Sequence, residues 1–104
     1  MTVKEFKFQY ALGTISKEDL IKIAKKSTSK YILTVLSKNK DWYIRSYVAT
    51  NSSTPIDALI KLSKDEDWFV RSRVTENPSV VEALSYEDSF ISWEVDNQIT
   101  SKMV

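Results

Sequence analysis

A segment of six residues occurs twice in this chain, 26 positions apart. Asp-Trp-Tyr-Ile-Arg-Ser at 41–46 returns as Asp-Trp-Phe-Val-Arg-Ser at 67–72. The same offset relates identical residues on both sides of it: Leu33 and Leu59, Val48 and Val74, Asn51 and Asn77. A fixed period of about 20–50 residues is typical of a solenoid, in which each unit buries its apolar face against its neighbours. The repeat therefore predicts a stack of similar units.

The repeat unit is predicted to consist of two short helices. Leu33 and Leu36 are three residues apart in its first half, and Ile44 and Val48 are four apart in its second half, which is helical spacing. The chain holds one glycine and two prolines. A β-sandwich needs more turns than so few of these residues provide. The expected fold class is all-α, with short paired helices in repeats of about 26 residues.

Helix boundaries are indicated by capping residues. Asp41 and Asp67 are candidate N-caps of the second helix in each unit. Thr54 followed by Pro55 suggests a cap and a proline at the first helical position. Near the N-terminus, Thr2 with a glutamate three residues later fits a capping box, and Gly13 suits the left-handed residue that ends a helix.

These signals divide a single domain, 1–104, into three parts. Residues 1–26 are predicted to form two helices that cap the N-terminal end of the stack. Residues 27–78 hold the two clear repeats. Residues 79–104 match them only after a one-residue deletion, with Trp93 in the place of Trp68, and are predicted to be a degenerate C-terminal capping repeat.

The repeated pattern resembles a known family. Asp-x-x-[Ile or Val]-Arg-x-x-Val-[Ala or Thr]-x-Asn, followed by Thr-Pro-x-x-x-Leu, resembles the variant leucine-rich repeat and is similar to the short HEAT-like helical repeat; the two copies cover residues 29–78. The resemblance implies a right-handed superhelix and a mostly non-enzymatic interaction module. Some variant-repeat proteins carry an iron–sulfur cluster on a Cys-rich segment, a feature that this cysteine-free chain cannot share.

Composition narrows the chemistry further. The chain has no Cys and no His, which removes disulfides, thiolate nucleophiles, zinc fingers and histidine general bases. No phosphate loop or metal-ligand spacing is visible, so we expect no enzyme activity and no cofactor. The chain shows neither a signal peptide nor an apolar run of about 20 residues, and we expect a cytoplasmic protein without a membrane segment.

Charge is distributed unevenly along the chain. Residues 1–50 carry ten Lys or Arg and four Asp or Glu, whereas residues 51–104 carry five and ten. In a linear stack this split would make the two ends opposite in charge, which allows head-to-tail self-association. The basic half also allows sequence-tolerant nucleic-acid binding, with these candidate contacts to phosphates or another charged partner: Lys25, Lys26, Lys38, Lys40, Arg45 and Arg71.

The two repeated arginines have a structural alternative. Arg45 and Arg71 each follow an aspartate by four residues, which permits an ion pair within the helix or a ladder between units. The repeated tryptophans, Trp42 and Trp68, are expected either to pack between units or to form a binding platform. Asn51 and Asn77 are expected to satisfy backbone groups where helices end.

The leading functional prediction is a protein–protein interaction module. Its candidate partner-binding residues occupy helix positions off the predicted core: Tyr43, Tyr47, Phe69 and Arg73. Nucleic-acid binding is the alternative function. The two differ in salt dependence, since neutralising phosphates releases counterions.

Overall fold

The computed structural model describes residues 1–82, and these residues are helical, with no strand among them. Six helices are joined by short turns: α1 (Val3–Leu12), α2 (Lys17–Lys26), α3 (Lys30–Leu36), α4 (Trp42–Thr50), α5 (Ile56–Leu62) and α6 (Trp68–Val74). A further helical turn covers residues 78–82. The all-α prediction is thereby confirmed for this part of the chain. Most of the predicted C-terminal capping repeat, including Trp93, lies outside the described residues.

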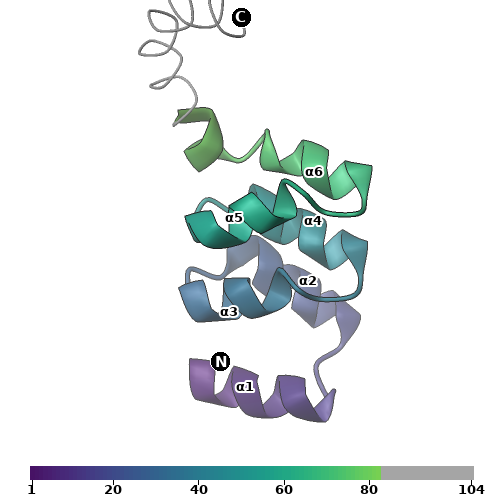
Figure 1. The fold of residues 1–104 in the computed structure, drawn as a ribbon. Helices are drawn as coiled ribbons and strands as arrows, with labels where there is room; N and C mark the ends of the chain where they lie inside the picture. The colour runs from purple at the N-terminus through teal and green to yellow at the C-terminus, as the bar shows by residue number, and fades with distance from the viewer. Residues whose placement is uncertain (83–104) are drawn as a thin grey trace, which may run out of the picture.

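The helices form two layers (Figure 1). One layer contains α2, α4 and α6, which pack side by side in that order. The other contains α1, α3 and α5, of which α3 and α5 pack on the helices that follow them in the sequence. The two copies of the repeated segment occupy α4 and α6, so they lie next to one another in the first layer.

Most of the predicted caps are present. The Thr2 side chain accepts a hydrogen bond from the Glu5 N–H and completes the capping box, and Gly13 ends α1 with a φ of 72°. Asp41 and Asp67 cap α4 and α6. The prediction for Thr54 is wrong, because Pro55 holds the N-cap position of α5 and no side chain caps that helix.

Thr54 instead forms a hydrogen bond with the preceding helix, α4. Its Oγ1 donates to the Val48 carbonyl at 2.7 Å, and its side chain is buried beneath the turn that links α4 to α5. Pro55 lacks an N–H, but the next residues of α5 still leave theirs without a side-chain partner. Thr54 therefore stabilises the end of α4 rather than the start of α5.

The core follows the predicted helical register. Ile44 and Val48 in α4 are 2% and 0% exposed, and Val70 and Val74 in α6 are also buried. Not every apolar residue of the repeat is in the core, because Ile56 and Ile60 in α5 are 58% and 51% exposed. In α5, only some of the apolar side chains face the core, and the others are exposed to solvent.

Two buried asparagines link neighbouring helices of the first layer. Asn51 Nδ2 donates to the carbonyls of Ala24 and Ser27, at 2.9 Å each. Asn77 Nδ2 donates in the same way to the carbonyls of Ala49, at 2.8 Å, and Asn51, at 2.9 Å. These carbonyls lie at the C-terminal end of the preceding helix, where four backbone acceptors lack helical partners. The prediction that the asparagines satisfy backbone groups at helix ends is confirmed. Asn51 binds the end of α2 and Asn77 binds the end of α4.

Candidate functional site

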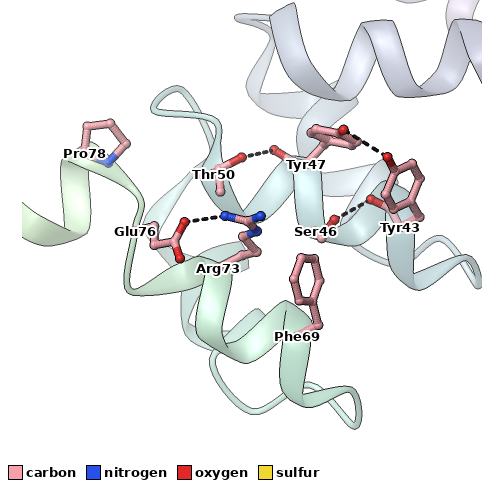
Figure 2. A pocket seen from close by; sticks show the side chains of 8 residues that line it. All are labelled: Tyr43, Ser46, Tyr47, Thr50, Phe69, Arg73, Glu76 and Pro78. Atoms are coloured by element: carbon pink, nitrogen blue, oxygen red, sulfur yellow. Dashed lines mark hydrogen bonds and ion pairs between the residues drawn. The ribbon is translucent and has the colours of Figure 1, made fainter.

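A groove of about 610 Å³ lies between α4 and α6 (Figure 2). We call it the aromatic groove and define it by the residues that line it: Tyr43, Ser46, Tyr47, Thr50, Phe69, Arg73, Glu76 and Pro78. All four residues that the sequence singled out for partner binding are among them. Tyr43 and Phe69 lie in the first turns of α4 and α6, and Tyr47 lies one turn after Tyr43. Arg73 lies in the last turn of α6, and Glu76 follows the end of that helix.

Helical periodicity explains why these residues meet. Tyr43 and Tyr47 are four residues apart on α4, and each directly precedes a buried residue of the core. Phe69 and Arg73 have the same relation to the core of α6. Since α4 and α6 pack side by side, the same helical face is presented twice and the pairs converge.

The sequence analysis missed part of the lining. Thr50 and Glu76 follow Tyr47 and Arg73 by three residues and are themselves 26 apart. Both could have been found by looking three residues after Tyr47 and Arg73 for positions on the same side of the helix that recur 26 residues apart. Pro78 belongs to the turn after α6 and carries no such signal.

The groove's aromatic rings contact one another edge to face. Tyr43 and Tyr47 have ring centroids 5.2 Å apart at 75°, and their hydroxyl oxygens are 3.2 Å apart. The hydrogen bond to Tyr47 raises the pKa of the Tyr43 hydroxyl. Trp42 of α4 contacts Phe69 of α6, with ring centroids 5.5 Å apart and ring planes at 84°. Such pairs are geometrically specific, so the rings hold one another in place.

The two tryptophans lie at the edge of this cluster. Trp42 is 44% exposed and packs between α4 and α6, as one of the two alternatives predicts. Trp68 is 68% exposed and contacts the ring of Phe69 edge to face, at 5.8 Å. Only the first of the pair therefore spans two helices of the layer among the described residues.

Each ring of the groove has a cation over one face. The ammonium of Lys17 lies 5.7 Å from the Tyr43 centroid, and that of Lys25 lies 5.2 Å from the Tyr47 centroid. The guanidinium of Arg73 lies 4.7 Å from the Phe69 centroid. Both lysines come from α2, so this helix contributes a basic border to a groove that α4 and α6 line.

Two of these cations also pair with carboxylates. Lys17 Nζ is 2.9 Å from Asp41 Oδ2, and this contact, helped by the Tyr43 N–H, lowers the pKa of the Asp41 carboxyl. Arg73 pairs with Glu76, three residues later on the same face. All four side chains retain substantial solvent exposure.

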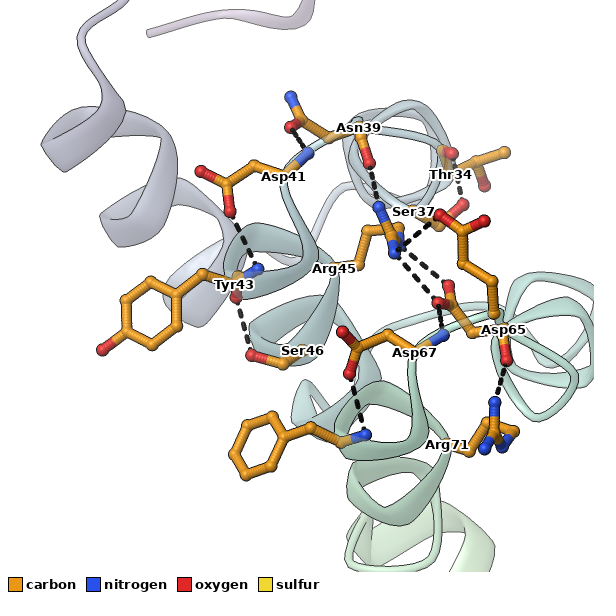
Figure 3. Close-up of polar contacts among 12 residues, drawn as sticks. Thr34, Ser37, Asn39, Asp41, Tyr43, Arg45, Ser46, Asp65, Asp67 and Arg71 are labelled. Carbon is orange, nitrogen blue, oxygen red and sulfur yellow. Dashed lines mark hydrogen bonds and ion pairs between the residues drawn. The ribbon is translucent and has the colours of Figure 1, made fainter.

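Arg45 is not available to a phosphate, contrary to the nucleic-acid prediction (Figure 3). Its Nε and Nη2 donate to the two carboxylate oxygens of Asp65 at 2.8 and 2.9 Å, and its Nη1 donates to the Asn39 carbonyl at 2.8 Å. The residue is 8% exposed. Arg45 therefore pairs with a residue of the turn after α5 and not with Asp41 of its own helix, and Arg71 forms no equivalent ion pair among the described residues.

This ion pair perturbs both of its partners. Burial opposes ionisation of Asp65, but the hydrogen bonds from Arg45 and the Asp67 N–H outweigh it and lower the pKa of that carboxyl. The hydrogen bonds that Arg45 donates to Asp65 raise the pKa of its guanidinium. Arg71, which occupies the equivalent place in α6, is exposed and donates to the Asp65 carbonyl.

The predicted basic contacts do not form one surface. Lys25 borders the aromatic groove, whereas Lys26 lines a separate hollow beside α2 with Met1 and Ile32. Lys38 and Lys40 are exposed in the turn between α3 and α4.

Other kinds of site were sought among residues 1–82. That part of the chain contains no group of three or more His, Cys, Asp or Glu side chains placed to hold a metal ion. None of its helices combines the length and the apolar character that crossing a membrane requires. Comparison of the chain with protein-family models, with curated proteins and with solved structures gives no match.

Proposed function

We propose that this protein is a non-enzymatic binding module that holds a segment of another protein in the aromatic groove. The observation that carries the proposal is the convergence of Tyr43, Tyr47, Phe69 and Arg73 on one groove between two adjacent helices. Aromatic residues and arginine are the side chains most enriched at the centres of protein interfaces. The rings are held by neighbouring rings, so little side-chain entropy remains to be lost on binding.

The proposed architecture is a right-handed solenoid with repeats of about 26 residues, as the resemblance to variant leucine-rich and short HEAT-like repeats implies. The matching hydrogen bonds of Asn51 and Asn77 to the preceding helix support it. In such a scaffold the aromatic groove is the surface between two successive second helices. Further units would extend the same surface along the stack.

Selection of peptides from a random displayed library tests this function. We expect the wild-type protein to enrich peptides that the double variant Tyr43→Ala, Phe69→Ala no longer binds. Tyr31→Ala is the matched control, because Tyr31 is an exposed aromatic residue on α3, outside the groove lining. Peptides that bind wild type and the double variant equally well would overturn the placement of the site.

Nucleic-acid binding is a second candidate, favoured by one observation. Lys17, Lys25 and Arg73 place cations over the three aromatic rings of the groove. A basic surface with aromatic rings can bind single strands without sequence preference. Anisotropy of labelled DNA and RNA at about 50 and 200 mM salt separates the candidates, since phosphate binding weakens steeply with salt. Our leading proposal predicts no binding at either concentration.

A further inference from the structure

The charge of the groove's surroundings indicates what kind of segment it binds. Three cations border the groove, those of Lys17, Lys25 and Arg73. The carboxylates of Asp41 and Glu76 pair with Lys17 and Arg73, so the border keeps an excess of positive charge. We propose that the groove binds an acidic segment of the partner protein, an inference that rests on the proposed function.

Lys25 is the cation best placed to receive a carboxylate. Its ammonium lies over the Tyr47 ring at the border of the groove, and it forms no ion pair with any carboxylate of the described residues. The side chain is exposed. A partner carboxylate can therefore reach this charge without first breaking a contact within the fold.

Arg73 supplies a second receptor at the opposite border. Its present partner, Glu76, is an exposed residue of the same helix end. Ion pairs at the surface contribute little stability, because both charges are well hydrated when apart. An incoming carboxylate can therefore replace Glu76 at low cost. The planar guanidinium also lies on Phe69, which fixes the direction of its donors.

The aromatic rings favour a polypeptide over nucleobases. A base that stacks needs an open ring face, whereas Tyr43, Tyr47 and Phe69 each have a cation over one face and another ring against them. The hollow between the rings can hold an apolar side chain of an extended peptide. The basic borders then bind acidic side chains on either side of it.

Helix spacing sets the separation of those acidic residues. Neighbouring helices pack about 8–10 Å apart, and an extended chain advances about 3.3 Å per residue. Lys25 lies on α2 and Arg73 on α6, but the lysine side chain reaches toward α4 and shortens the distance. We expect acidic positions about three to six residues apart, with an apolar residue between them.

Random peptides of about 12 residues, which span roughly 40 Å when extended, are the probe for selection. Three proteins are compared: wild type, Lys25→Glu with Arg73→Glu, and Lys61→Glu with Lys64→Glu. The last pair has the same change in net charge at exposed positions of α5 and the turn after it. Thermal unfolding followed by circular dichroism establishes that each variant is folded.

We expect wild type and the Lys61, Lys64 control to enrich acidic peptides. The Lys25, Arg73 variant should bind a synthetic copy of such a peptide about tenfold more weakly or worse, because like charges now face each other. Acidic peptides that bind this variant as tightly as wild type would overturn the inference. An acidic preference that the control variant also loses would overturn it too, because net charge alone would then explain the effect.

Two further outcomes separate this inference from the proposed function. Enriched peptides without acidic bias that still require Tyr43 and Phe69 would overturn the inference and support the groove as a binding site. Absence of enrichment by wild type, or salt-sensitive binding of labelled DNA or RNA in place of peptides, would overturn both.

Discussion

The helical pairs α3–α4 and α5–α6 carry nearly the same sequence, yet they connect differently to the helices before them. In both, an aspartate side chain caps the second helix at 2.9 Å from the second backbone N–H of that helix. In both, the aspartate's own N–H donates to a side-chain oxygen two residues earlier, which belongs to Asn39 in one pair and Asp65 in the other. The local turn is therefore the same.

The difference lies in what these two residues contact in the preceding unit. Asn39 Nδ2 donates to the Tyr10 hydroxyl of α1 at 2.8 Å, whereas the carboxylate of Asp65 accepts both hydrogen bonds from Arg45 of α4. Both residues accept the N–H of the capping aspartate, which is their shared local role. They differ in the helix with which the rest of the side chain forms hydrogen bonds. The side chain at this position matches the neighbour on which the unit packs.

A charge in the core that both helical pairs share should have the largest effect on stability. Val48 is fully buried in α4, which packs against both α2 and α6, and Val48→Asp would place an unpaired carboxylate there. We expect a loss of several kcal/mol, enough to unfold a marginally stable domain. Circular dichroism should show a lost or much lower melting transition. Val3→Asp, at an exposed position of α1, is the control, and an unchanged melting point for Val48→Asp would contradict the helical register.

Exchange of the two turn residues tests the difference directly. Asp65→Asn leaves Arg45 nearly buried without a countercharge, and we expect it to lower the free energy of unfolding by about 2–4 kcal/mol. Asn39→Asp keeps an acceptor for the Tyr10 hydroxyl and should cost less than about 1 kcal/mol. Urea denaturation measures both. Equal losses for the two variants would show that Asn39 and Asp65 are equivalent.

The buried asparagines should behave alike where the turn residues do not. Asn51→Ala and Asn77→Ala each remove two hydrogen bonds to the preceding helix, and we expect each to cost about 1–3 kcal/mol. The same urea titrations give the values, with the exposed Ser52→Ala as control. A loss at one asparagine and none at the other would contradict their equivalence.

Acid should weaken the α4–α5 connection by a smaller amount over the accessible pH range. The ordinary pKa of an aspartate is 3.8, and that of Asp65 is lower in the folded protein. The unfolded chain therefore binds its proton first as the pH falls, so the contribution of Asp65 is full above the ordinary pKa and is lost through the folded pKa.

Stability measured from pH 7 downward should accordingly fall more steeply for wild type than for Asp65→Asn at the acid end. The lowered pKa of Asp41 contributes in the same direction in both proteins and cancels in the comparison. Identical acid dependence of the two proteins would exclude a role for the Asp65 carboxylate.

The smallest expected effect comes from the second repeated arginine. Arg71 is exposed and bonds to one carbonyl, so Arg71→Ala should change the free energy of unfolding by less than about 1 kcal/mol. Arg45→Ala should cost several times more, since it leaves Asp65 without its partner. A loss for Arg71→Ala as large as that for Arg45→Ala would show that sequence position alone sets the role of these residues.

Much of the candidate site was accessible from the sequence. Tyr43, Tyr47, Phe69 and Arg73 each precede a core residue, and helical geometry places such residues together on one side of a buried face. What the spacing did not show is that Lys17 and Lys25, from a helix without the repeated segment, lie over two of the rings. That contact depends on how α2 packs against α4.

The sequence by itself determined the helical class, the caps at Asp41 and Asp67, and the buried register of Val48 and Val74, because these follow from interactions within a few residues along one helix. Only the tertiary structure decided that Arg45 pairs with Asp65, that Thr54 donates a hydrogen bond to the end of α4, and that basic side chains of α2 border the aromatic groove. These contacts join residues on different helices or across a turn, so they depend on how the elements pack against one another. Local spacing does not specify that packing.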